Sequence, residues 1–137
     1  MPAVPDISPE ATWDALRDDP MAVLVDVRTD AEWNFVGVPD LSDAAKRVVL
    51  IPWQIYPSMQ VNAQFLDMLT RSGITPQHSV YFLCRSGARS MSAAMAAQAE
   101  GYGSVFNVAD GFEGPVGPSG HRDVAGWKAA GLPWMQR

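Results

Sequence analysis

A nearly unbroken apolar stretch at residues 22–27 limits the fold of this chain more than any other feature. It consists of Ala-Val-Leu-Val-Asp-Val, and a second apolar run occupies residues 79–83. Successive side chains of a strand point to opposite faces, so a strand that is apolar at adjoining positions is buried on both faces. Such strands are typical of parallel sheets that helices cover on both sides. We therefore expect an α/β fold.

Segments with helical signals alternate with these apolar runs. Ser8 is suited to the N-cap and Pro9 to the first position of a helix that should end near residue 19. Further strands are expected at residues 47–51 and 104–108, and further helices at 30–33, 62–71, 88–100 and 127–131. This alternation predicts one domain over residues 1–137, with a central, mostly parallel sheet flanked by helices.

Composition and charge narrow the function classes. The chain has 47% apolar and 18% charged residues, as ordinary soluble domains have, and no apolar run approaches the ~18 residues of a membrane helix. Its net charge of −5 argues against a nucleic-acid partner. The chain has one cysteine, which excludes an internal disulfide, and its two histidines are too far apart in sequence to suggest a structural zinc site. No secretory signal is visible. We expect a cytoplasmic protein without a metal or a membrane partner.

The one cysteine, Cys84, follows the apolar run and precedes the helix expected over residues 88–100. At such a place backbone N–H groups from residues 85–90 converge, and the helix dipole favours negative charge. Two arginines lie in the same loop, and positive surroundings favour the reactive thiolate over the thiol. A lone cysteine is often an inert core residue, but a run of Arg-Ser-Gly-Ala-Arg-Ser does not suit a core. We predict that Cys84 is a nucleophile.

Four segments of the chain, taken in order, resemble a single-domain rhodanese, which is a sulfurtransferase-type domain. The segment that carries most of the resemblance is the Cys-Arg-Ser-Gly-Ala-Arg-Ser loop at 84–90. The others are Leu-Val-Asp-Val-Arg at 24–28 with Glu32-Trp33, residues 49–52, and residues 108–111 with Gly-Trp at 126–127 and Ala-Gly-Leu-Pro at 130–133. The resemblance spans residues 8–134 and implies a rhodanese-like three-layer fold.

The chain departs from the family pattern in two places. Residues 36–40 read Val-Gly-Val-Pro-Asp, so the histidine of the family's Gly-His-Ile-Pro-Gly-Ala element is absent. Residues 112–125 resemble a Gly/Pro-rich inserted loop, within a loop at 110–126 that holds five glycines and two prolines. Loops of this length in compact domains are usually functional or disordered. The charged or titratable residues of the insertion are Glu113, His121, Arg122 and Asp123.

The resemblance implies an enzyme of the thiosulfate sulfurtransferase type that needs no cofactor. Sulfane sulfur would pass from thiosulfate or a persulfide donor to a thiophilic acceptor through a persulfide on Cys84. The expected partners are a small anionic sulfur donor and a protein thiol as acceptor. The alternative is a persulfide-carrying or protein-interaction module without significant turnover of small molecules.

The site residues that the resemblance implies lie in and around the loop. Cys84 is the catalytic residue, and the substrate-binding residues are Arg85, Ser86, Gly87, Ala88, Arg89 and Ser90. A guanidinium binds sulfonate-like oxygens in a bidentate manner, which favours Arg85 as the group that holds the donor. Arg89 either pins the loop or contacts the substrate.

Three further residues are expected to support the loop from outside it. They are Asp26, Arg28 and Glu32. An aspartate at the end of a strand often anchors the amides of a neighbouring loop. For Arg28 and Glu32, four residues apart, we expect a salt bridge with each other.

A phosphatase or arsenate reductase of related architecture is a weaker alternative. Those enzymes use a Cys-x5-Arg loop, usually with histidine before the cysteine. Here four residues separate Cys84 from Arg89, and Leu83 stands where the histidine would be. The loop is one residue too short to surround a tetrahedral phosphate.

Overall fold

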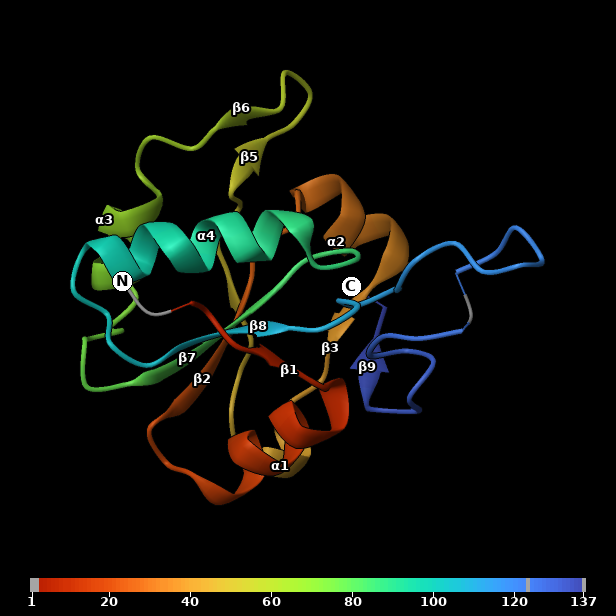
Figure 1. The fold of residues 1–137 in the computed structure, drawn as a ribbon, viewed down its shortest axis with the longest axis horizontal. Coiled ribbons are helices and arrows are strands. Elements are labelled where there is room, and N and C mark those ends of the chain that lie inside the picture. The colour runs from red at the N-terminus through yellow and green to blue at the C-terminus, as the bar shows by residue number, and fades with distance from the viewer. Residues whose placement is uncertain (1–2, 123, 137) are drawn as a thin grey trace.

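A five-stranded parallel sheet forms the centre of the computed structural model, which describes residues 3–122 and 124–136 (Figure 1). The strands are ordered β1 (Asp6–Ile7), β8 (Val105–Val108), β7 (Ser79–Leu83), β2 (Ala22–Asp26) and β4 (Val49–Leu50). β2 and β7 pair in register from Ala22 opposite Ser79 to Asp26 opposite Leu83. The carboxyl ends of the two central strands therefore meet at one level, directly before Cys84.

Helices cover both faces of the sheet, as the apolar strands predicted. α1 (Pro9–Asp18) lies on one face, while α3 (Phe65–Arg71) and α4 (Ala88–Ala99) lie on the other (Figure 1). Adjoining residues of β2 enter opposite cores: Leu24 packs on the side of α1, and Val25 on the side of α3 and α4. The three-layer rhodanese-like fold is thus confirmed.

Several predicted elements are present with shifted ends. The Ser8 hydroxyl accepts a hydrogen bond from the Ala11 amide at 3.1 Å, so α1 begins as predicted. β4 is shorter than the predicted strand at 47–51, and α3 begins at Phe65 rather than at residue 62. The short helix expected at 30–33 begins where predicted, because Thr29 and Glu32 form a capping box there, and it continues to Val36 as α2 (Asp30–Val36).

The helix predicted at residues 127–131 is wrong. These residues form turns, and the chain then enters β9 (Trp134–Met135), which pairs antiparallel with β3 (Val38–Pro39). Gly126 and Gly131 have φ values of +104° and +75°, outside the helical region, and the four residues between them are too few to nucleate a helix.

Besides β1, β3 and β9, a hairpin and a short helix have no counterpart in the sequence prediction. A hairpin of β5 (Gln54–Ile55) and β6 (Gln60–Val61) stands away from the sheet on the side of α3 and α4 (Figure 1). A short 3₁₀ helix covers Ser42–Ala44.

Residues 112–122 and 124–125 form turns and loop, and Asp123 lies outside the described residues. Across the described ranges, no helix combines the length and hydrophobicity needed to span a membrane.

Candidate active site

Cys84 lies at the carboxyl end of β7, on the loop that leads into α4. Its Sγ atom accepts hydrogen bonds from the Gly87 amide at 3.1 Å and from the Ser90 hydroxyl at 3.2 Å. Gly87 has a φ of +116°, a left-handed conformation that glycine adopts without strain, and this turn directs its N–H back toward the sulfur. Among the described residues these are the two donors to Sγ, fewer than the ring of amides expected from residues 85–90.

A buried polar network behind the sulfur was missed by the sequence analysis. Asn107 of β8 is 3% exposed, and its Oδ1 atom lies within hydrogen-bond distance of the Ser90 hydroxyl. Its amide nitrogen donates to the Gly87 carbonyl at 3.2 Å and to Asp6 Oδ1 at 2.9 Å. A hydroxyl has one proton to donate, so at any moment Ser90 donates to one of three acceptors: Asn107 Oδ1, Cys84 Sγ or the Gly87 carbonyl. The single asparagine inside the apolar strand Val-Phe-Asn-Val was the available signal.

Arg89 and Glu32 form a two-pronged ion pair across 57 residues of sequence. The distances are 2.6 Å from Nη1 to Oε1 and 2.9 Å from Nη2 to Oε2. Burial opposes the charge of the Glu32 carboxylate, but hydrogen bonds and charge from Arg89, with help from Thr29, outweigh it and lower the pKa of Glu32. Of the two roles left open for Arg89, this geometry corresponds to pinning the start of α4 onto α2.

The expected salt bridge between Arg28 and Glu32 is wrong. Arg28 pairs with Asp26 instead, with Nη2 2.7 Å from Oδ2 and Nε 3.0 Å from Oδ1, and both side chains are completely buried. Nη2 also donates to the Gly37 carbonyl at 2.7 Å, and the guanidinium lies 4.2 Å from the centre of the Phe112 ring. The pair connects the end of β2 with the segment after α2 and with the inserted loop.

The start of the predicted insertion is attached directly to the cysteine loop. The Phe112 amide donates to the Cys84 carbonyl at 2.8 Å, and the amides of Glu113 and Gly114 both donate to the Arg85 carbonyl at 3.0 Å. Gly111 permits this close approach, because a Cβ atom there would lie 2.5 Å from the Cys84 carbonyl oxygen. As a result, the Glu113 carboxylate reaches Arg85, with Oε2 3.0 Å from Nε.

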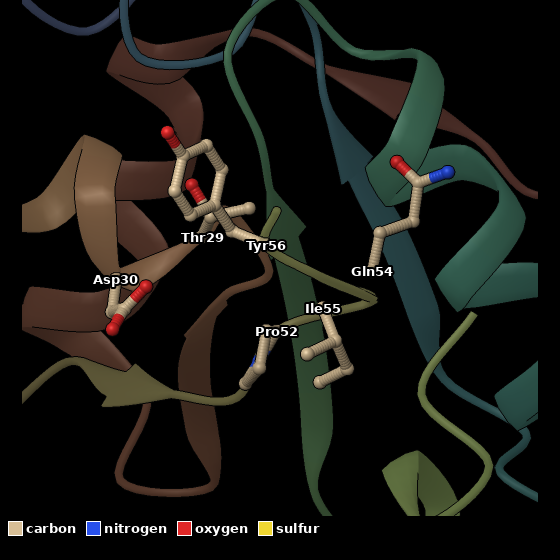
Figure 2. Close-up of a pocket in the computed structure, with 6 residues that line it drawn as sticks. All are labelled: Thr29, Asp30, Pro52, Gln54, Ile55 and Tyr56. Atoms are coloured by element: carbon tan, nitrogen blue, oxygen red, sulfur yellow. The ribbon is translucent and has the colours of Figure 1, made fainter. Parts of the chain in front are cut away.

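Two cavities flank the loop. One, of about 310 Å³, is lined by Arg85, Arg89 and Glu32 and by the hairpin residues Tyr56 and Met59, with Thr29 and Ala31. The other, of about 410 Å³, is lined by Ser86, Gly87 and Met91, with Asp6, Asn107, Ala109 and Asp110. A smaller cavity of about 220 Å³, drawn in Figure 2, shares Thr29 and Tyr56 with the first. The cavity lined by both loop arginines therefore extends to Tyr56 and Met59 of the β5–β6 hairpin.

Replacing Glu32 by glutamine is expected to lower the free energy of unfolding by about 1–3 kcal/mol at neutral pH. Glutamine also serves in a capping box, so the variant removes the charge and keeps the cap. Because the folded pKa of Glu32 lies below its ordinary value of 4.5, its contribution is present above pH 4.5 and is lost as the pH falls through the folded pKa. Urea denaturation of both proteins against pH measures this; an equal difference at acidic and neutral pH would contradict it.

Comparisons with known proteins agree with this fold. The family model described as the STR4 middle domain matches residues 6–137. The chain is 46% identical to Rv0390 from M. tuberculosis, whose crystal structure aligns with a TM-score of 0.89 over 99% of this chain and 100% of that one.

Two curated relatives bear informative names. The chain is 31% identical over 129 residues to the chloroplastic protein THYLAKOID RHODANESE-LIKE of Oryza sativa subsp. indica, covering 93% of this chain and 24% of that protein. It is 28% identical over 130 residues to a protein named sulfurtransferase in Allochromatium vinosum, covering 95% and 94%. The chain therefore belongs to the STR4 middle domain family and is a rhodanese-like domain.

Proposed function

We propose that this protein is a sulfurtransferase that carries sulfane sulfur as a persulfide on Cys84. The observation that carries the proposal is the position of Sγ at the start of α4, where it accepts hydrogen bonds from the Gly87 amide and the Ser90 hydroxyl. The Gly87 amide donates to the sulfur, and the Ser90 hydroxyl does so when its proton is turned to Cys84 rather than to Asn107; each such bond stabilises negative charge on a thiolate or on the outer sulfur of a persulfide. The similarity to rhodanese-like relatives supports the same chemistry.

The reaction consists of two displacements. In the first, the Cys84 thiolate attacks the outer sulfur of the donor; an S–S bond to Sγ forms, and the donor's own S–S bond breaks. Thiosulfate then leaves as sulfite, and a persulfide donor leaves as a thiolate, in each case with the electron pair of the broken bond. In the second, a nucleophilic acceptor such as cyanide, a small thiol or a protein cysteine attacks the outer sulfur and releases the Cys84 thiolate.

The start of α4 favours both displacements. Negative charge remains on sulfur throughout, and α4 places its positive dipole end beside it. The Arg89–Glu32 ion pair fixes the first turn of this helix, so the donors to Sγ are already oriented before a substrate arrives. The thiolate needs no neighbouring general base once its charge is stabilised in this way.

Intact-mass spectrometry tests the proposal. We expect the protein to gain the mass of one sulfur atom after incubation with thiosulfate or with a small organic persulfide, and to lose it again when cyanide is added. Continued formation of thiocyanate over many turnovers would indicate an enzyme, whereas a single release would indicate a persulfide carrier. An unchanged mass with both donors would contradict the proposal.

A further inference from the structure

We infer that Glu113 makes this site selective for persulfide donors over thiosulfate; the inference rests on the proposed function. Arg85 is the residue expected to hold the anionic oxygens of a donor, but its guanidinium is already paired with the Glu113 carboxylate. The carboxylate contacts Nε of Arg85 and cancels much of the positive charge that would attract an anionic donor.

The buried carboxylate of Glu113 has its charge balanced by an ion pair with Arg85. The side chain is 15% exposed. Its buried Oε2 atom forms the ion pair with Arg85 but no hydrogen bond among the described residues. The ammonium of Lys128 also interacts electrostatically with Glu113, but its hydrogen bond goes to the Val36 carbonyl at 2.9 Å. If Arg85 turned toward a doubly charged donor, a buried carboxylate oxygen would lose its ion-pair partner, which is unfavourable.

The second arginine of the loop is committed as well. Arg89 uses both terminal nitrogens on Glu32, and its side chain is 20% exposed. Each cation that lines the 310 Å³ cavity is therefore matched by a carboxylate, Arg85 by Glu113 and Arg89 by Glu32. The cavity is close to neutral, although its loop sequence contains two arginines.

How strongly such a cavity stabilises the reaction depends on the charge of the sulfur donor. Thiosulfate carries two negative charges, and its leaving group, sulfite, departs with two. An organic persulfide carries one at most, and its leaving thiolate one. A cavity whose cations are already paired with carboxylates stabilises sulfur transfer from a persulfide better than transfer from thiosulfate. The apolar parts of Tyr56 and Met59, which also line the cavity, suit the carbon substituent of a thiol-derived donor and have no role toward thiosulfate.

The position of Glu113 is determined by the backbone rather than by its side chain alone. Amides of residues 112–114 donate to the carbonyls of Cys84 and Arg85, so the carboxylate is held beside the loop. An ion pair built on such a support is pre-organised and does not have to form when a substrate arrives.

The test compares wild-type protein with Glu113→Gln, and with Glu100→Gln as a matched loss of one exposed negative charge outside the site. The rate of sulfur loading on Cys84 is measured against thiosulfate and against the persulfide of N-acetylcysteamine, which has no other charge. We expect Glu113→Gln to raise kcat/KM for thiosulfate ~10-fold and to leave the persulfide value within ~2-fold, since removing one like charge near an anion has an effect of this order. Glu100→Gln should change neither.

Each outcome decides the question. An unchanged thiosulfate rate, or an equal gain for both donors, would overturn the role of Glu113 and leave the proposed function standing. Loading by neither donor, in any variant, would instead overturn the proposed function and the inference with it. Should Glu113→Gln unfold, wild-type protein still provides a test: excess sulfate, a dianion, is expected not to slow loading by the persulfide. Competitive inhibition by sulfate would contradict a neutralised cavity.

Discussion

Replacing Cys84 by serine is expected to reduce sulfur transfer to the background rate. The chain has one cysteine, so no second thiol can take over the attack or carry the sulfur. A hydroxyl at this place is far less acidic than a thiol and forms no persulfide, so the covalent intermediate is lost and not merely slowed. Sulfite release from thiosulfate, thiocyanate formation with cyanide and the intact mass after donor treatment measure the loss.

The same variant separates chemistry from folding. Cys84 is 1% exposed, and serine has a similar size and keeps hydrogen-bond partners in the Gly87 amide and the Ser90 hydroxyl. The free energy of unfolding should therefore stay within about 1 kcal/mol of wild type. A sulfur adduct on the Cys84→Ser protein, or undiminished thiocyanate formation, would rule out the cysteine as the carrier.

Replacing Arg28 by methionine is expected to destabilise the fold by about 3–5 kcal/mol. The guanidinium is completely buried and neutralises Asp26, which is completely buried as well. Removing the cation leaves a carboxylate without its counter-charge inside the protein, and this cost exceeds that of losing the attraction alone. The contacts of Arg28 with the Gly37 carbonyl and with the Phe112 ring are lost with it.

A double variant distinguishes this cause from a loss of packing. With Asp26→Leu added to Arg28→Met, no buried charge remains, and we expect most of the lost stability to return, since apolar residues often replace buried ion pairs at little cost. Chemical denaturation of the three proteins gives the coupling energy. A single variant that loses less than about 1 kcal/mol, or a double variant less stable than Arg28→Met, would contradict the argument.

The choice of partner for Arg28 shows where sequence reasoning failed. Residues four apart face each other on a helix, and this spacing suggested a bridge between Arg28 and Glu32. Arg28, however, precedes the capping box of Thr29 and Glu32 and lies in the bend between β2 and α2. In this bend the backbone amide and the guanidinium of Arg28 both donate to Asp26 Oδ1, because an aspartate side chain readily bonds the backbone two residues on. The helix predicted at 30–33 already began after Arg28, so the helical spacing rule did not apply to Arg28 and Glu32.

Other partners were beyond the reach of any local pattern. Glu32 and Arg89 are 57 residues apart, and Ser90 and Asn107 are 17 apart on different elements. Arg85 meets Glu113 because the backbone after β8 is hydrogen-bonded along the cysteine loop, a path set by a loop without periodic signals. Charge and side-chain type made these residues candidates, but long-range packing selected the pairs.

The sequence by itself determined the layer architecture, the strand before Cys84 and the helix after it. These follow from apolar periodicity, caps and glycine, which act over a few neighbouring residues. Only the tertiary structure decided which carboxylate neutralises which arginine, and therefore how much positive charge the loop presents to a substrate. Ion pairing depends on distances between side chains from separate elements, and those distances exist only once the sheet and its loops have assembled.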